Sequence, residues 1–363
     1  MKNKNLALGL MSGTSCDGLT IAAVQLRPFG IVAFENYAYP APLQKRLLTA
    51  LQLRAPQLSA LHFELGKLYA QKTKIFLKKY HISADKLLCI GSHGQTIYHG
   101  PYDQEPNTLQ IGEPSFLADM AGCAVVSNFR ERDMALGGQG APLMPFFDEY
   151  IFGKSTPKIL LNLGGIANLS VVGKNVKTYG FDCGPANTLM DLACEKYLKI
   201  PFDKNGARAA KGTPDKALVA RLLTQKYFLQ KPPKSLDKND FGPAYLKKYF
   251  AAFDRARIND LLATLNYFTA ACVAHAIAHF VPAAQRREMI VSGGGAFNKT
   301  LLANLRALVS IPVKNSALTG MDPQAKEAAA FALFAAQAVR GKSNHCPFAT
   351  GAKKQTILGR ITL

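Results

Sequence analysis

Apolar residues occur along this chain in short runs that end in glycine-containing turns. The first run covers residues 6–11 and leads into a loop of small, hydroxyl-bearing residues, after which a second run covers 21–26. The same order returns at 158–163 and 166–172, where two glycines separate the apolar runs. Short apolar runs bounded by turn residues are typical of buried strands. We therefore predict two β-hairpins, each of which opens one half of the chain.

Elsewhere the apolar positions recur every three or four residues, which is the spacing of one face of an α-helix. Helices are predicted in this way over residues 58–79, 187–197, 258–280, 298–308 and 324–339. A third glycine turn, Gly293–Gly295, follows the apolar run 289–292, and Asn298 can cap the helix after it. Strands that alternate with helices, in an order that occurs twice, indicate an α/β protein with two similar halves around a cleft.

The division between the halves is predicted where glycine and proline interrupt the pattern at residues 137–142. The N-terminal half then covers residues 1–140 and contains the first hairpin. The C-terminal half covers residues 141–363 and contains the second hairpin and the third glycine turn. With 363 residues, 48% of them hydrophobic, the chain is long enough to form two domains with their own cores.

The chain is strongly basic, with 44 Lys and Arg residues against 24 Asp and Glu residues and a formal net charge of +20. Such a charge suits nucleic acid, an anionic surface or acidic small substrates. The basic residues are spread along the chain and are densest over 201–260, where aromatic residues do not alternate with them as base stacking would require. We interpret them as a solvated basic face and predict no nucleic-acid partner.

The seven cysteines are scattered and include no C-x-x-C pair, which favours a reducing compartment over a disulfide scaffold or a structural zinc site. The apolar run 6–11 behind Lys2 and Lys4 is too short for the core of a signal peptide. No run is expected to reach the length of a membrane span. We therefore expect a cytoplasmic protein without a membrane partner.

The loop of the first predicted hairpin is a candidate phosphate site. Gly13 and Gly18 permit close backbone approach, Thr14 and Ser15 carry hydroxyls, and Asp17 adds a carboxylate. Backbone amides in such a loop can converge on an anion. The loop is not a Walker loop, because it has no lysine and a strand follows it. For this loop alone, an ordinary tight hairpin is the alternative.

Three other polar clusters follow predicted strands or turns. His93 is a candidate acid, base or hydrogen-bond donor, with a structural histidine as the alternative. Arg130 and Arg132 suit bidentate contacts to an anion, or they form a surface ion-pair loop. Asp182 stands before a predicted helix, where a carboxylate can hold Mg²⁺, act as a general base or cap the helix. Glycine loops, hydroxyls, a metal ion and one base are sufficient for phosphoryl transfer from ATP, which depends mainly on positioning and electrostatics.

The chain resembles the anhydro-N-acetylmuramic acid kinases in a series of segments that occur in the same order. The segments are GLMSGTSCDG, SHGQT, TLQIGEP, FRERD, GGQGAPLMP, NLGGIANL, FDCGPAN and SGGGAFN, which lie between residues 9 and 298. A further segment, EAAAFA at 327–332, is similar to the C-terminal helix of these kinases. The resemblance implies the actin- and hexokinase-like ATPase fold, in which two ribonuclease-H-like halves with mixed sheets surround a central cleft. It also implies a homodimer.

The reaction implied by the resemblance begins from a sugar without a free 6-hydroxyl. In 1,6-anhydro-N-acetylmuramic acid, O6 closes an internal ether. Water attacks C1 and opens the ring, while O6 takes the γ-phosphoryl group of ATP. The product is N-acetylmuramic acid 6-phosphate, which belongs to peptidoglycan recycling. Asp182 matches the residue that deprotonates the water.

The resemblance also assigns binding residues. The positions that match the nucleotide-binding segments are Gly13, Thr14, Ser15, Cys16, Asp17, Gly18, Leu19, Thr20, Gly164, Gly165, Asn168, Gly293, Gly294 and Gly295. The expected substrate contacts are His93, Thr96, Arg130, Asn187 and Glu327. An arginine suits the lactyl carboxylate of the sugar, and Asp17 is expected to help hold Mg²⁺.

The chain departs from the family pattern at several positions. Thr20 stands where the family often has Asp, and Ala186 stands where it has Gly, so a methyl group could crowd the sugar beside Asp182. The loop KSLDKN at 234–239 shares only its first two residues with the family's KSTGRE. Two alternatives therefore stay open. One is a conventional sugar or acyl kinase of the same fold that acts on a free hydroxyl or carboxylate, and the other is a non-catalytic ATP-dependent switch.

Overall fold

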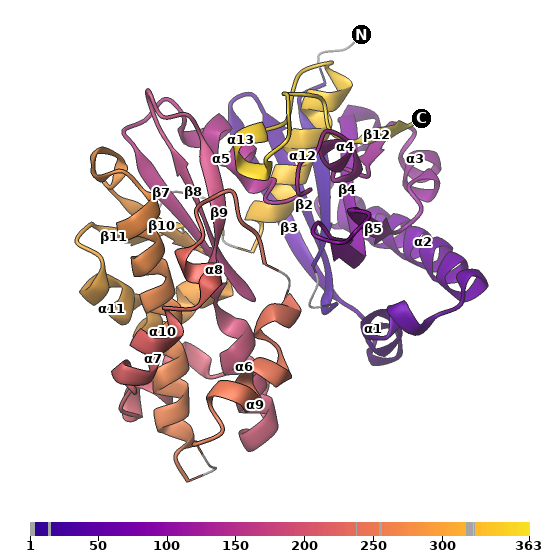
Figure 1. Cartoon of the computed structure of the whole chain (residues 1–363). Helices are drawn as coiled ribbons and strands as arrows, with labels where there is room; N and C mark the ends of the chain where they lie inside the picture. Colours follow the sequence, from indigo (N-terminus) through magenta and orange to yellow (C-terminus); the bar gives the residue numbers. More distant parts are fainter. Residues whose placement is uncertain (1–3, 14–15, 237, 254–255, 317–321, 323) are drawn as a thin grey trace. The chain divides into compact units, whose positions relative to one another are not determined.

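The computed structural model of the chain divides into two compact units (Figure 1). Unit 1 consists of Met1–Phe147 together with Gln324–Leu363, and unit 2 consists of Asp148–Pro323. The described residues are all those of the chain except 1–3, 14–15, 237, 254–255, 317–321 and 323. Each unit contains one mixed β-sheet with helices packed on it.

The sheet of unit 1 begins with antiparallel strands and continues with parallel ones. Its strands are β1 (Leu6–Ser12), β2 (Gly18–Leu26), β3 (Phe29–Ala38), β4 (Leu87–Gly100), β5 (Asn107–Ile111), β6 (Ala124–Ser127) and β12 (Arg360–Thr362). The strand order is β12-β6-β4-β1-β2-β3, with β5 paired to β4. β1, β2 and β3 pair antiparallel, whereas β4 lies parallel to both β1 and β6.

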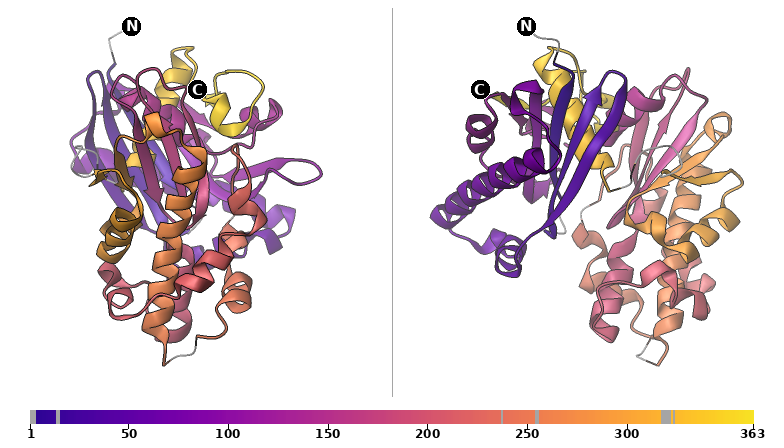
Figure 2. Two further views of the ribbon diagram at one scale, coloured as in Figure 1. Left: turned by 60° about the vertical axis from the view of Figure 1, so that its left-hand side comes forward. Right: turned by 180° about the vertical axis from the view of Figure 1, so that it is seen from behind.

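Helices cover both faces of this sheet (Figure 2). They are α1 (Ala41–Leu48), α2 (Ala55–Lys79), α3 (Ser115–Ala121), α4 (Glu131–Ala135), α12 (Lys326–Val339) and α13 (Pro347–Thr350), while α5 (Met144–Phe152) spans the division between the units. Alternate residues of a strand face opposite sides of the sheet. Leu8 and Leu10 of β1 accordingly join a core with Leu61 and Leu65 of α2, whereas Gly9 faces α12.

Glycine permits the close contact between α12 and the sheet. A Cβ atom added at Gly9 would lie 1.8 Å from the carbonyl oxygen of Ala328, and one added at Gly91 of β4 would lie 2.0 Å from that of Phe331. Real Cβ atoms do not approach backbone oxygens so closely, because the atoms would overlap. The two glycines therefore let the helix backbone rest directly on β1 and β4.

Unit 2 repeats the same strand plan. Its strands are β7 (Lys158–Leu163), β8 (Ile166–Val172), β9 (Tyr179–Pro185), β10 (Met289–Ser292) and β11 (Val313–Asn315), and their order is β11-β10-β7-β8-β9. β7, β8 and β9 pair antiparallel, and β10 lies parallel to β7 and β11. The helices are α6 (Asn187–Leu198), α7 (Lys216–Leu222), α8 (Lys226–Leu229), α9 (Pro243–Tyr249), α10 (Ile258–Phe280) and α11 (Lys299–Leu308).

The topology confirms the predicted α/β fold with two ribonuclease-H-like halves. In both units three antiparallel strands in meander order are followed by two parallel strands added beside the first one. Both predicted hairpins are present, as β1–β2 and β7–β8. The predicted cap of α11 is also present, since the Asn298 side chain accepts a hydrogen bond from the Leu301 amide at 3.0 Å.

The compact units differ from the predicted division in the placement of the C-terminal segment. The predicted division falls once, after residue 140, and places everything that follows in the second half. In the structure, Gln324–Leu363 belongs to unit 1. The physical reason is the contact of α12 with Gly9 and Gly91 and the pairing of β12 with β6, both of which join segments far apart in sequence.

Helix α10 reaches the length and apolar composition of a membrane span, contrary to the expectation that no run does so. In its most apolar window, 78% of the residues are buried inside the protein. The core helix of a globular domain has the same composition, because it is surrounded by apolar neighbours on all sides. The burial of α10 identifies it as a core helix of unit 2.

Candidate functional site

The loop between β1 and β2 is held in place by a chain of buried polar side chains. Gln95 of β4 is fully buried, and its Nε2 donates to the carbonyl oxygen of Gly13 at 2.9 Å. Its Oε1 accepts from the Ser12 hydroxyl at 2.6 Å, and Ser12 lies 2.8 Å from the Tyr39 hydroxyl. Tyr39 in turn lies 3.1 Å from the Tyr69 hydroxyl. Burial raises the pKa of Tyr39 to about 12.

The residues of this loop that were assigned to nucleotide binding differ in exposure. Cys16 is buried and adopts a left-handed backbone with φ 55°, whereas the Asp17 side chain is exposed. Leu19 is 1% exposed in the core, so a contact from it to a ligand would involve its backbone only. Thr20 donates its hydroxyl to Asn36 at 2.6 Å across the sheet. Thr14 and Ser15 lie outside the described residues.

His93 and Arg130 lie side by side in unit 1, as the sequence analysis grouped them for substrate binding. Arg130 Nε donates to His93 Nε2 at 3.1 Å, and because a guanidinium has no acceptor, Nε2 is the unprotonated ring nitrogen. Nδ1 then donates to the carbonyl oxygen of Gly94 at 2.8 Å. Burial and the Arg130 charge lower the pKa of His93 to about 3. A neutral imidazole whose lone pair accepts from Arg130 is suited to orienting that arginine. This favours a structural role of His93 in holding Arg130 over a role as general acid or base.

This tautomer has a consequence for the pH dependence of stability. An unfolded histidine binds a proton below pH ~6.5, whereas folded His93 stays neutral until about pH 3, so acidification favours unfolding. We expect the suppressed protonation of folded His93 to lower the free energy of unfolding by about 2 kcal/mol as the pH falls from 6.5 to 5. His93→Gln keeps an oxygen acceptor for Arg130 and cannot titrate. Urea unfolding at pH 7 and pH 5 should show a smaller acid destabilisation in this variant, and equal pH dependence in both proteins would contradict the assignment.

A buried aspartate fixes Arg130 indirectly, through the backbone of Gly140. Asp133 is fully buried and accepts hydrogen bonds from His345 Nε2 at 2.6 Å, Thr350 Oγ1 at 2.5 Å and the Gly140 amide at 2.6 Å. The Gly140 carbonyl then accepts from Arg130 at 2.8 Å. The C-terminal segment therefore fixes the orientation of Arg130 through the loop that Asp133 organises.

The two remaining substrate candidates of unit 1 are partly buried. Thr96 lies on β4, where its hydroxyl accepts from Gln110 Nε2 at 3.4 Å. Glu327 lies in the first turn of α12. Burial raises the pKa of Glu327, and the charges of Lys326 and Arg130 oppose that shift. The Arg130 guanidinium and the Glu327 carboxyl therefore interact electrostatically.

The second hairpin turn is joined to the start of α6. The amides of Ala186 and Asn187 donate to the carbonyl oxygens of Gly165 at 2.8 Å and Gly164 at 3.0 Å. The Asn187 side-chain amide also donates to the carbonyl oxygen of Gly164 at 2.8 Å, and Asn187 is the first residue of α6, so the N-cap position belongs to Ala186. A Cβ atom added at Gly294 would lie 3.7 Å from Asn187 Nδ2. Unit 2 thus brings together the predicted residues Gly164, Gly165, Asn187, Gly293, Gly294 and Gly295.

Asp182 lies on β9 next to this turn, and its carboxylate is held by a loop. Its Cα partner on β8 is Asn168, another predicted site residue. The Leu236 amide donates to Asp182 Oδ2 at 2.7 Å, and the Asp182 amide donates to the carbonyl oxygen of Lys234 at 3.1 Å. The carboxylate is partly exposed. An oriented carboxylate that reaches solvent can accept a proton from water.

Ala186, where the family has glycine, creates no crowding at the open face of this site. Its side chain is fully buried and belongs to the core of unit 2. Its φ of −112° is also outside the region that requires glycine. The methyl group of Ala186, which follows β9 directly, is therefore buried in the core.

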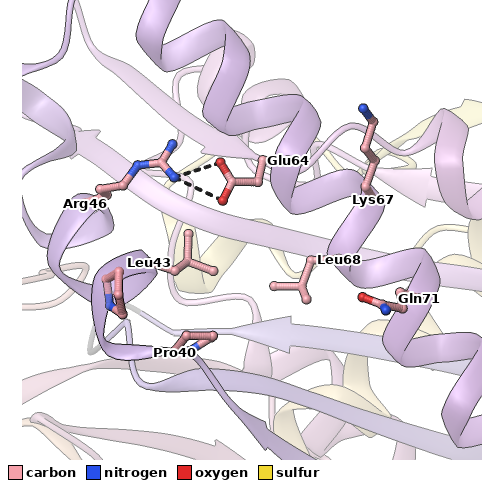
Figure 3. A pocket seen from close by; sticks show the side chains of 8 residues that line it. Pro40, Leu43, Arg46, Glu64, Lys67, Leu68 and Gln71 are labelled. Atoms are coloured by element: carbon pink, nitrogen blue, oxygen red, sulfur yellow. Dashed lines mark hydrogen bonds and ion pairs between the residues drawn. The ribbon is translucent and has the colours of Figure 1, made fainter.

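A cavity of about 530 Å³ between α1 and α2 contains none of the predicted site residues. Leu43 and Leu68 form its apolar lining, and Arg46 pairs with Glu64 at its edge (Figure 3). Both charged side chains are nearly half exposed, so this pair contributes little to stability. The cavity is separate from the residues described above.

Sequence reasoning missed several residues that hold the site together. Gln95 stands inside the SHGQT segment, but its contacts to Ser12 and Gly13 depend on the pairing of β4 with β1. His345 lies 212 residues from Asp133, and no local pattern announces that pair. Lys234 was assigned to an ordinary loop, because nothing in a lysine-rich segment indicates which lysine is buried.

The repeated ribonuclease-H-like unit, with a glycine turn in the first hairpin of each copy, defines a protein of the actin- and hexokinase-like ATPase class. A family model described as anhydro-N-acetylmuramic acid kinase matches residues 5–363. The chain is 40% identical over 367 residues to the anhydro-N-acetylmuramic acid kinase of Coxiella burnetii, and the aligned region covers 99% of this chain and 97% of that protein. It is 38% identical over 385 residues to that of Salinibacter ruber, with 100% and 97% covered. The chain belongs to the anhydro-N-acetylmuramic acid kinase family.

Solved structures of lower similarity include the following two proteins. Component A of the (R)-2-hydroxyglutaryl-CoA dehydratase of Acidaminococcus fermentans has a TM-score of 0.47 and 13% identity, with 92% of this chain and 99% of that chain covered. A ROK family glucokinase from Streptomyces griseus, in complex with glucose and AMPPNP, has a TM-score of 0.40 and 16% identity, with 92% and 99% covered.

Proposed function

We propose that this protein is an ATP-dependent kinase that hydrolytically opens 1,6-anhydro-N-acetylmuramic acid and phosphorylates O6. The observation that carries the proposal is the oriented carboxylate of Asp182 beside the Gly164–Gly165 turn, in a chain that belongs to this family throughout its length. The related kinases of Coxiella burnetii and Salinibacter ruber supply the substrate class.

The proposed step begins when Asp182 takes a proton from a water molecule. The water oxygen forms a bond to C1 as the C1–O6 bond breaks, and O6 forms a bond to the γ-phosphorus of ATP as ADP leaves. The proton remains on the Asp182 carboxylate until it passes to solvent. Leu236 orients the carboxylate through its amide, which keeps the accepting oxygen in a defined position.

We assign ATP binding to the glycine turns of the chain. The Gly165 and Gly294 backbones are exposed, and side chains would narrow the approach to them. We assign the phosphates to the β1–β2 loop and the Gly164–Gly165 turn, and the adenosine to Gly293–Gly295. The assignment predicts that loosening the first loop weakens nucleotide binding.

Mg²⁺ fits a site with a single protein carboxylate. Among the described residues, no group of three His, Cys, Asp or Glu side chains could hold a metal ion. Mg²⁺ in nucleotide sites commonly takes one or two carboxylates with phosphate oxygens and water as the other ligands, so the exposed Asp17 is a compatible donor. When bound, the ion would neutralise charge that develops on the transferred phosphoryl group.

The substrate contacts are assigned to His93, Thr96, Arg130, Asn187 and Glu327. Arg130 is held by His93 and Gly140, and a fixed guanidinium suits the lactyl carboxylate of the sugar. We further propose a cytoplasmic homodimer in peptidoglycan recycling that acts on this small molecule and has neither nucleic acid nor membrane as a partner.

Replacing Gln95 tests the role of the first loop. We expect Gln95→Ala to weaken ATP binding about tenfold, because Ser12 and the Gly13 carbonyl lose buried hydrogen-bond partners. Calorimetric titration with a non-hydrolysable ATP analogue measures the effect. Gln71→Ala, at an exposed position of α2, is the matched control. Unchanged affinity in Gln95→Ala would remove this loop from the nucleotide site.

Two sugars distinguish the proposed reaction from a conventional kinase. The purified enzyme is incubated with ATP and Mg²⁺ and either the anhydro sugar or its ring-opened form, which has a free 6-hydroxyl, and ADP release is followed. We expect rapid ADP release with the anhydro sugar and little with the ring-opened one. The opposite preference would identify a conventional sugar kinase of the same fold.

A further inference from the structure

Lys234 is a buried cation in unit 2 with an unusual environment. Its side chain belongs to a residue that is only 1% exposed, although lysine is almost never fully buried without a partner. Its Nζ lies 4.6 Å from the ring centroids of Tyr227 and Phe280 and 5.8 Å from that of Phe181. It also donates to the carbonyl oxygen of Tyr227 at 3.1 Å. Three ring faces and one carbonyl thus replace part of its hydration.

The elements that surround this ammonium are the ones that hold Asp182. Phe181 precedes Asp182 directly on β9. Tyr227 of α8 donates its hydroxyl to the Asp182 carbonyl at 2.7 Å. The Lys234 carbonyl accepts from the Asp182 amide, and the Leu236 amide donates to the carboxylate. The amide, the carbonyl and the carboxylate of Asp182 are all bonded to the segment 227–236, which lies near β9 in Figure 1.

We propose that Lys234 is a positioning residue for Asp182, an inference that rests on the proposed role of Asp182 as the base. The buried ammonium anchors the loop among the three rings, and two residues later the Leu236 amide reaches the carboxylate. If the anchor is lost, the loop can shift and the carboxylate loses its fixed donor. A displacement of about 1 Å at a reacting group can cost a factor on the order of 10² in rate.

The positive charge is the part of Lys234 that an apolar residue cannot replace. A methionine has a similar length and fills the same space, but it neither donates to Tyr227 nor gains from the negative faces of the rings. Burial lowers the pKa of Lys234, whereas the charge of Asp182 opposes the shift. An apolar side chain would avoid this desolvation, so a role in packing alone gives no reason for a lysine here.

The test compares Lys234→Met with Lys231→Met, an exposed lysine in the same loop. We expect Lys234→Met to lower kcat by about 10- to 100-fold while the KM values for ATP and sugar change less than about twofold. Lys231→Met should match the wild type. A normal kcat, or a rise in KM at constant kcat, in Lys234→Met overturns the proposal. Should that variant not fold, Phe280→Leu removes one ring and should show the same pattern with a smaller fall in kcat; a normal kcat there also overturns it.

The same substitution in an Asp182→Asn background separates the two claims. If Lys234 acts through Asp182, Lys234→Met should lower the residual single-turnover rate of Asp182→Asn by less than about twofold. An equal fall in both backgrounds means that Lys234 acts independently of Asp182 and overturns the inference. Near-normal turnover of Asp182→Asn alone would instead overturn the proposed function. A large loss in Asp182→Asn together with normal turnover in Lys234→Met would overturn the inference alone.

Discussion

Asp182→Asn is expected to lower kcat by about 10³-fold, within the range that general-base catalysis contributes. Asparagine has nearly the same shape, and its side-chain oxygen can still accept from the Leu236 amide, so the loop should keep its place. It cannot take a proton from the attacking water at neutral pH. The effect therefore isolates proton transfer from positioning.

The measurement is a steady-state assay with titration calorimetry of an ATP analogue alongside. Nucleotide affinity should stay within about twofold of the wild type, because the glycine turns are unchanged. Asp119→Asn, at an exposed position of α3, is a control for loss of one carboxylate and should have normal activity. If Asp182→Asn turns over at a near-normal rate, Asp182 is not the base.

The second large effect is expected at Gly9, where the backbone of α12 rests on β1. An alanine Cβ would lie 1.8 Å from the Ala328 carbonyl oxygen and 2.6 Å from the Ala332 amide nitrogen. Neither backbone atom can move without displacing the helix from the sheet. We expect Gly9→Ala to lower the free energy of unfolding by about 3 kcal/mol or more, as overpacking against a rigid backbone does.

Gly30→Ala provides the matched comparison within the same sheet. Gly30 lies on β3, and a Cβ atom added there has no neighbour within 4 Å. Its effect on the free energy of unfolding should stay within about 0.5 kcal/mol. Urea unfolding of the two variants and the wild type gives the differences in the free energy of unfolding. A Gly9→Ala protein that does not fold at all would also agree with the prediction. Equal unfolding midpoints for Gly9→Ala and the wild type would show that the helix contact is not tight.

The local pattern of the sequence was enough to predict the elements that lie close together along the chain. The two hairpins, the turn at Gly164–Gly165 and the cap at Asn298 all depend on residues within a few positions of one another. The spacing of apolar residues over 324–339 also predicted the helix that is present there as α12. The repeated order of strands and helices then predicted the fold class.

Contacts between distant segments could not be predicted from local pattern. Gly9 is a strand residue whose partner, Ala328, lies at the other end of the chain, and this contact returns the C-terminal segment to unit 1. The Asn187 side chain donates to the carbonyl oxygen of Gly164 in the hairpin turn, a contact that spans 23 positions of the sequence. Lys234 reads as one more surface lysine until its three rings are brought together by folding.

The central claim is that one water molecule enters the sugar in the same reaction that phosphorylates O6. Mass spectrometry of the product formed from ATP, Mg²⁺ and 1,6-anhydro-N-acetylmuramic acid tests it directly. We expect a product whose mass equals that of the anhydro sugar plus one water and one phosphoryl group. A product that carries the phosphoryl group without the water, or the absence of a phosphorylated product with the pure enzyme, would contradict it.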